Sequence, residues 1–197
     1  MVIRKGEPYG EKGTLETGLI VQSDYELRAV VLVASEGSIP LTGLTAGDMC
    51  KTLGGRGNLE LRRDDVTLCP IDLGWVTVDG VEHCFVAHCR VGRLFHRDFL
   101  MAMNAQFWEE LDLAPRGHPN DGKLDFLSGG LSFRTRRQAR QRAKSGTHLP
   151  HPGLSMKSAA EFTFRTRRQR FFLDGVDMGH GSEFVFRCQP DALTVAV

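Results

Sequence analysis

The chain has 197 residues, of which 41% are hydrophobic and 25% are charged, with a formal net charge of +1. This composition is ordinary for a globular protein with a substantial core and excludes a disordered or fibrous chain. No apolar run approaches the ~20 residues that a transmembrane helix needs, and the polar stretch 1–13 has no signal-peptide core, so we expect a cytoplasmic protein.

The first third of the chain alternates between short strands and helices. Leu19-Ile20-Val21 is an apolar strand, and Asp24 is placed to cap a helix over residues 25–35, where apolar residues recur at helical spacing. Residues 39–44 predict a second strand and residues 46–53 a short helix. This β-α-β-α order indicates a small parallel unit over residues 1–57.

After residue 57 the apolar period changes from 3.6 to 2. Asp79-Gly80 lies between two alternating runs, which is a strong hairpin signal. Further short strands are expected at residues 123–127, 162–164, 170–173, 183–187 and 193–197, with turns at Asp174-Gly175 and Pro190-Asp191. The predicted fold class is therefore α+β and β-rich: an antiparallel β-sandwich over residues 58–197 with a small N-terminal β-α-β-α unit.

Positive charge is concentrated in one segment. Residues 126–170 hold eleven Lys or Arg and one acid, Glu161, which gives +10 and leaves −9 for the rest of the chain. Residues 132–145 have a helix-forming composition, and their arginines form either a solvated face or a site for phosphate or anionic lipid. No aromatic residues are interleaved with them, so nucleic acid is not expected. The candidate anion-binding residues are Arg116, Arg137, Arg140 and His148.

Residues 114–125 form a polar turn between two apolar runs. Pro115 and Pro119 fix φ, and Asn120-Asp121-Gly122 tolerates positive φ. Two interpretations stay open for Asp121. Its carboxylate either binds a hard cation together with backbone carbonyls or accepts a hydrogen bond from its own backbone.

The order of several short motifs resembles the bacterial diacylglycerol kinases and the sphingosine kinase-like lipid kinases. These motifs are Asp72-Leu73-Gly74, a hairpin, Asn104, Pro115…Asp121-Gly122-Lys123-Leu124-Asp125, Leu173-Asp174-Gly175 and Pro190-Asp191-Ala192-Leu193. Those enzymes have an NAD-kinase-like nucleotide domain followed by a β-sandwich domain. The resemblance covers about residues 71–197 and implies that residues 1–57 are a truncated nucleotide domain.

The resemblance assigns nucleotide-binding roles to three residues. The family loop Gly-Gly-Asp-Gly-Thr falls on residues 22–26, where Asp24 matches, and Gly-Thr-Gly-Asn-Asp falls on residues 44–48, where Thr45 and Asp48 match. The glycines that let backbone N–H groups surround phosphates are missing. These departures argue against ATP as a ligand.

The resemblance also implies a general base and a cation. The family base is the Glu of an Asp-Gly-Glu turn, but that position is Val176 here, which leaves Asp174 and Asp177 as catalytic candidates. The family cation is Mg²⁺. Its ligands here would be the Asp121 side chain and the backbone oxygens of His118 and Lys123.

The first hypothesis is a non-catalytic diacylglycerol-kinase-like protein that binds an anionic phosphorylated or lipid ligand. Such a protein can also contact a membrane surface transiently. The alternative is an active phosphotransferase with a reduced or subunit-shared ATP site. A third hypothesis is an interaction module for a separate nucleotide domain. A homodimer would cover the sheet edge that a truncated domain exposes.

Overall fold

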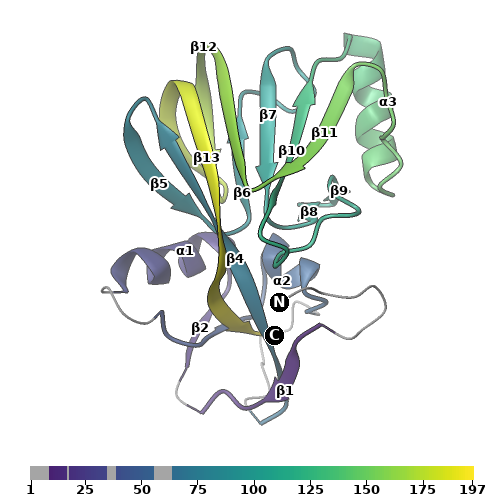
Figure 1. Cartoon of the computed structure of the whole chain (residues 1–197). Helices are drawn as coiled ribbons and strands as arrows, with labels where there is room; N and C mark the ends of the chain where they lie inside the picture. The colour runs from purple at the N-terminus through teal and green to yellow at the C-terminus, as the bar shows by residue number, and fades with distance from the viewer. Residues whose placement is uncertain (1–8, 17, 35–38, 56–63) are drawn as a thin grey trace.

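The computed structural model describes residues 9–16, 18–34, 39–55 and 64–197 (Figure 1). The helices in these ranges are α1 (Asp24–Val33), α2 (Asp48–Thr52) and α3 (Phe133–Ala143). The strands of the main sheet are β1 (Glu11–Gly13), β2 (Leu19–Val21), β3 (Thr42–Leu44), β4 (Val66–Val78), β5 (Val81–Phe85), β6 (His88–Val91), β7 (Phe99–Met103), β10 (Leu124–Gly129), β11 (Leu154–Ala159), β12 (Glu161–Leu173) and β13 (Val176–Ala196). A separate two-stranded ladder joins β8 (Phe107–Trp108) to β9 (Leu111–Asp112). No described helix is long and apolar enough to cross a membrane.

Within the described residues, the main sheet has eleven strands and folds over an aromatic core. Its order is β1-β4-β13-β12-β6-β7-β10-β11, with β5 paired to β4, β3 to β13 and β2 to β3. Phe126 of β10 packs against Phe186 of β13 with ring centroids 5.3 Å apart, although three strands separate β10 from β13 in the sheet. The sheet must therefore curve to bring its two halves face to face, as Figure 1 shows. The predicted β-rich α+β fold is confirmed.

Two predicted hairpins are confirmed and one predicted turn is wrong. Asp79 and Gly80 have φ of 47° and 91°, and Asp174 and Gly175 have φ of 47° and 85°, as a tight hairpin turn requires. By contrast, Pro190-Asp191 lies inside β13, where the pairing with β4 shifts register between Gln189 and Leu193. That segment is a β-bulge in a continuous strand, so the strands predicted at residues 183–187 and 193–197 are parts of one.

The N-terminal unit has the predicted β-α-β-α order, and its strands extend the main sheet. β2 pairs with β3 and β3 pairs with β13, both in parallel. The predicted cap of α1 is wrong by one residue, because the Ser23 side chain accepts the Glu26 N–H and Asp24 already lies inside the helix. The predicted domain boundary after residue 57 falls outside the described residues and stays a prediction.

α3 confirms the predicted basic helix. Ser132 caps it, and only Ala139 and Ala143 are buried. The six residues Phe133–Gln138 recur at Phe164–Gln169, where they lie in β12. The same letters therefore form a helix in one place and a strand in another, because packing outweighs intrinsic propensity in so short a segment.

Candidate functional site

A small acidic hollow lies where α1 and α2 meet the main sheet. It has a volume of about 230 Å³, and its lining includes Asp24, Asp48, His88 and Asp174. The structure thus gathers two predicted nucleotide-binding residues and one predicted catalytic residue from distant parts of the chain. Thr45, the third predicted nucleotide residue, does not line this hollow; it is buried, and its hydroxyl donates to the Val21 carbonyl.

Asp24 holds the start of α2. Its carboxylate accepts the backbone N–H of Asp48 at 2.7 Å and that of Met49 at 3.1 Å. A Cβ on Gly47, whose φ is +102°, would lie 2.6 Å from the Asp24 Oδ1, so glycine is required there. Burial and then the nearby Asp174 carboxylate raise the pKa of Asp24 to about 6. The side chain therefore serves as the cap of α2.

At the start of α1, side chains of the same segment also accept the backbone N–H groups. Ser23 Oγ accepts the Glu26 N–H at 3.2 Å, and the Glu26 carboxylate accepts the Gln22 N–H at 2.6 Å. This reciprocal arrangement resembles a capping box. The backbone N–H groups of Gln22 and Glu26 at the start of α1 are therefore bonded to side chains of the chain itself, one of them a carboxylate.

Asp48 connects α2 to the sandwich. Its Oδ1 accepts the Glu109 N–H at 2.9 Å, and its Oδ2 lies 3.7 Å from His88 Nδ1. Burial and then the Asp24 carboxylate raise the pKa of Asp48 to about 7, while burial lowers the pKa of His88 to about 4. His88 Nε2 lies 2.6 Å from the Phe107 carbonyl, which assigns the ring proton to Nε2. A neutral His88 then leaves Nδ1 as an acceptor facing Asp48.

The Asp174 carboxylate bonds to three backbone N–H groups and lies beside a buried arginine. It accepts the N–H groups of Val86, Ala87 and His88 at 2.8–3.0 Å, and the Arg28 Nε lies 3.9 Å away. Burial raises the pKa of Asp174 to about 6. Asp177, the second catalytic candidate, lies apart on the surface, where it accepts from Arg170 Nε at 3.2 Å. The structure therefore does not bring the two candidates together.

The polar turn at residues 114–125 is held by another buried carboxylate, Asp72. This side chain accepts the Gly122 N–H at 2.7 Å and the Asp191 N–H at 2.9 Å, and so ties the turn to the bulge of β13. Asp121 Oδ1 accepts the Lys123 N–H at 3.0 Å, as expected for a side chain that closes its own turn. His118 Nδ1 accepts the Asn120 N–H.

The Mg²⁺ site at this turn stays a prediction. Among the described residues, no group of three or more His, Cys, Asp or Glu side chains is arranged to hold a metal. Asp121 would be the single charged ligand, and a bond from Lys123 N–H already occupies one of its oxygens. This donor set is a poor fit for a cation that prefers several oxygen ligands.

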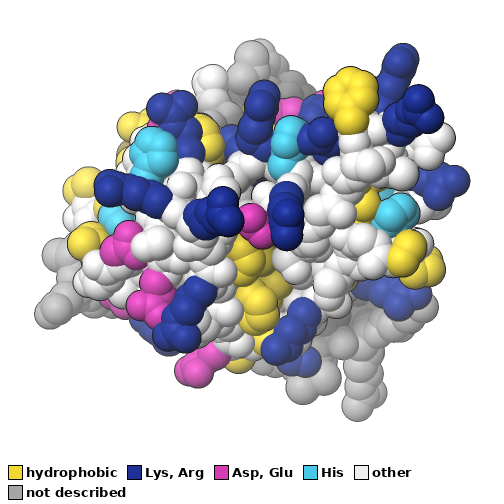
Figure 2. Space-filling model, turned by 90° about the horizontal axis from the view of Figure 1, so that it is seen from above, with side chains coloured by type: hydrophobic (Ala, Val, Ile, Leu, Met, Phe, Trp, Pro, Cys, Tyr) yellow, Lys and Arg dark blue, Asp and Glu magenta, His cyan; other side chains and the backbone are white. Residues whose placement is uncertain are grey.

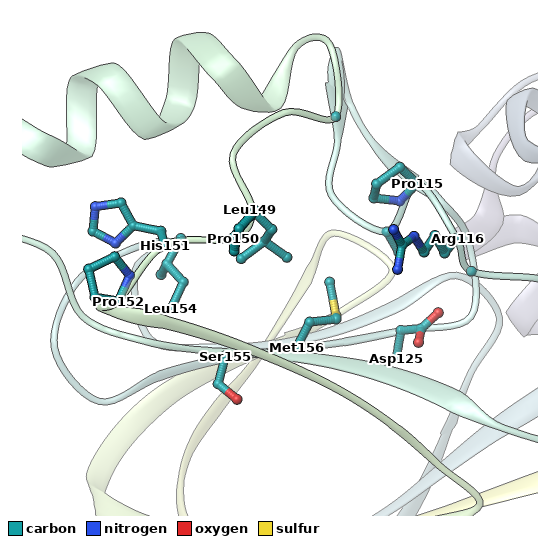
Figure 3. A pocket seen from close by; sticks show the side chains of 13 residues that line it. Pro115, Arg116, Asp125, Leu149, Pro150, His151, Pro152, Leu154, Ser155 and Met156 are labelled. Atoms are coloured by element: carbon teal, nitrogen blue, oxygen red, sulfur yellow. The ribbon is translucent and has the colours of Figure 1, made fainter.

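The predicted anion-binding residues fall in three places. Arg116 lines a largely apolar hollow of about 950 Å³ beside Leu149, Pro150 and Met156 (Figure 3). Arg137 and Arg140 line a groove between α3 and residues 93–96. His148 is buried against Phe95, with ring centroids 6.2 Å apart, so it lies away from the surface.

The groove beside α3, which we call the arginine groove, has a volume of about 880 Å³. Its cationic lining is Arg93, His96, Arg134, Arg136, Arg137 and Arg140. Arg140 lies 3.7 Å from Glu109 and 3.5 Å from Glu110. In the described part of the chain, no ion pair joins the other four arginines to a carboxylate.

Sequence reasoning missed Arg93 and His96. A signal for them existed, since residues 93–97 hold two arginines and a histidine, but no local pattern places this loop against a helix forty positions later. The contact between Arg136 and the His96 ring fixes that placement.

Comparison with known proteins identifies solved structures that share the fold of this chain. The sequence matches no protein-family profile, and it matches no curated protein. Three solved structures from Bacillus anthracis strain Sterne, one described as a diacylglycerol kinase and two as putative diacylglycerol kinases, are 13%, 12% and 11% identical to this chain, with TM-scores of 0.55, 0.59 and 0.57. Each match covers 80% of this chain and 66%, 68% and 69% of the respective structure, so the chain spans about two thirds of their length. The chain therefore has the fold of bacterial diacylglycerol kinases.

Proposed function

We propose that this chain is a diacylglycerol-kinase-like protein that binds an anionic phosphorylated or lipid ligand without transferring phosphate from ATP. One observation carries the proposal: at both helix starts in the candidate nucleotide region, the chain's own acids accept the backbone N–H groups. A triphosphate would have to displace the Glu26 and Asp24 carboxylates, and it would meet their charge.

The arginine groove is the best place for the anionic ligand. Arg93, Arg134, Arg136 and Arg137 line one hollow without a carboxylate partner in the described chain. Guanidinium groups bind phosphate oxygens with paired N–H donors, and they do so most strongly when no internal acid competes. This assignment keeps Arg137 from the sequence prediction and replaces Arg116 and His148 with Arg93, Arg134 and Arg136. The predicted Arg140 also lines the groove, but it is paired with Glu109 and Glu110.

Isothermal titration calorimetry on the whole chain tests both parts. sn-Glycerol 3-phosphate or monomeric dihexanoyl phosphatidic acid should bind with an affinity that falls as salt rises, and Mg·ATP should bind no more tightly than inorganic phosphate does. Inorganic phosphate as a third probe separates a general phosphate site from a lipid-headgroup site. Micromolar binding of Mg·ATP that Arg137→Ala leaves unchanged would place the nucleotide outside the arginine groove and overturn the non-catalytic assignment.

The alternative, an active phosphotransferase, is favoured by the meeting of Asp24, Asp48 and Asp174 in one hollow. In that case Asp24→Asn and Asp48→Asn should each abolish phosphate transfer from ATP, while Glu161→Gln on the exposed start of β12 should not. Equal turnover in all three variants would remove this alternative, provided that circular dichroism shows each variant folded.

A further inference from the structure

One end of the sandwich collects arginines from three separate segments. Arg93 and Arg97 lie in the loop between β6 and β7, Phe133 and Arg134 begin α3, and Arg167 and Arg168 lie where β12 shifts register against β13. All six side chains are exposed. We call this set the basic end.

Contacts between these segments place them together. Arg93, Phe133 and Arg134 line the same groove, and Arg97 lines a second hollow with Leu131 and Phe164. The Gly92 N–H donates to the Arg170 carbonyl at 2.9 Å, which joins the loop to β12. Figure 2 looks onto this end of the molecule and shows Lys and Arg side chains spread across it.

Little of this charge is neutralised internally. Among the described residues, no ion pair links Arg93, Arg97, Arg134 or Arg167 to a carboxylate, although the exposed Asp98 stands in the same loop and the fifth arginine, Arg168, has Asp79 as an acidic neighbour. Arginines paired on the surface of this sandwich, such as Arg165 with Glu183, show that the chain supplies partners elsewhere. The charge at the basic end is therefore available to an external polyanion.

Phe133 indicates which polyanion fits. Its side chain is 82% exposed, the highest exposure of any aromatic residue in the described chain, and the Arg136 guanidinium lies 5.7 Å from its ring centroid. A lone apolar ring beside Arg134, at the tip of a basic surface, gains free energy when it enters the acyl boundary of a bilayer. Single-stranded nucleic acid would instead use several aromatic platforms along a groove.

We propose that the basic end docks on an anionic lipid bilayer, with the arginines at the headgroups and the Phe133 ring inserted. This inference does not depend on the ligand of the arginine groove. Each cationic side chain near an anionic surface strengthens binding by about fivefold, and insertion of the ring by about tenfold or more.

Vesicle sedimentation with the full chain tests the proposal. The wild type should bind vesicles of phosphatidylcholine mixed with phosphatidylglycerol, should not bind pure phosphatidylcholine, and should be released at about 0.5 M salt. Arg97→Glu should weaken binding by about tenfold or more. Lys12→Glu, the same charge change on β1 at the opposite end of the molecule, should have little effect.

The role of the ring needs its own pair of variants. Phe133→Ser should weaken vesicle binding by about tenfold, whereas Val33→Ser, at a side chain 84% exposed on α1, should not. Phe133→Trp should gain a fluorescence blue shift and quenching by brominated lipid that the wild type lacks. Equal binding by Arg97→Glu and Lys12→Glu, or no quenching of the new Trp, would overturn docking at this end.

Two further outcomes keep this test separate from the proposed function. Arg97→Glu should retain affinity for glycerol 3-phosphate, because Arg97 lies outside the arginine groove. Tighter binding to a single-stranded RNA oligonucleotide than to vesicles presenting the same phosphate concentration would replace the membrane by nucleic acid as the partner.

Discussion

The acidic hollow and the arginine groove are both charged, but their charges are used differently. In the hollow, Asp24, Asp48 and Asp174 accept six backbone N–H groups between them, and Arg28 and His88 stand beside two of those carboxylates. In the groove, four arginines have no carboxylate partner within the described chain. The difference indicates that the acids hold the fold together, whereas the positive charge of the arginines is not balanced by an internal carboxylate and can be used to bind another molecule.

The largest expected effect on stability comes from replacing Asp174, and it tests whether the acids hold the fold together. Asp174→Ala leaves the N–H groups of residues 86–88 without their acceptor and Arg28 without its counter-ion in a buried site. We expect the free energy of unfolding to fall by about 3 kcal/mol or more, measured by urea denaturation. Asp177→Ala, on the surface, should cost about 0.5 kcal/mol. Equal effects would mean that Asp174 does not anchor the link between β5 and β6.

These acids also show what the sequence could predict. The turns at Asp79-Gly80 and Asp174-Gly175 follow from local chemistry, because two residues that tolerate positive φ are sufficient to define them. The conformation of Asp191 is not local, since its N–H is held by Asp72 from 119 positions away. Pro190-Asp191 has the composition of a turn, and only the buried carboxylate of a neighbouring strand makes it a bulge.

The candidate site could also be predicted only where its geometry depends on neighbouring residues in the sequence. Asp24 was predicted to be a helix cap from its place before an apolar helix, and a nucleotide ligand from the resemblance to the lipid kinases. It does cap a helix, but α2 rather than α1. No pattern within residues 22–26 could reveal this, because the acceptor and the two amides lie more than twenty positions apart and meet only when β2 and β3 pair.

The second expected effect is a loss of ligand affinity when an unpaired arginine of the groove is replaced. Arg137→Ala should lower the affinity for dihexanoyl phosphatidic acid by about tenfold, because a charge-assisted bond to phosphate is lost and no internal acid offsets that loss. Arg140→Ala is the matched control from the same helix and groove. Its guanidinium already faces Glu109 and Glu110, so its removal should change affinity by about twofold. Calorimetry measures both, and the reverse order would contradict the distinction between paired and unpaired arginines.

The smallest effect is a pH dependence that belongs to Asp48. Its folded-state pKa of about 7 lies above the usual value of 3.8, so protonation stabilises the fold. This stabilisation is complete below pH 3.8 and is lost as the pH rises through about 7. Several histidines act in the opposite direction in part of this range, because burial lowers their pKa: His83, His88, His96, His118 and His148. The informative quantity is therefore the difference between wild type and Asp48→Asn.

Between about pH 6 and pH 8, the stability of the wild type should fall by about 1 kcal/mol relative to Asp48→Asn, whose amide cannot ionise. Urea denaturation at a series of pH values measures this difference. Asp79→Asn is the matched control: hydrogen bonds from Glu183 and Ser182 lower the pKa of Asp79 from 3.8, so its own titration lies outside this interval. Between about pH 6 and pH 8, the stability of Asp79→Asn should change with pH as that of the wild type does.

If the stability of Asp48→Asn also changed with pH as that of the wild type does, Asp48 would ionise as a surface acid does. The hollow would then carry one more negative charge at neutral pH, but its carboxylates would still be bonded to backbone N–H groups, unlike the arginines of the groove.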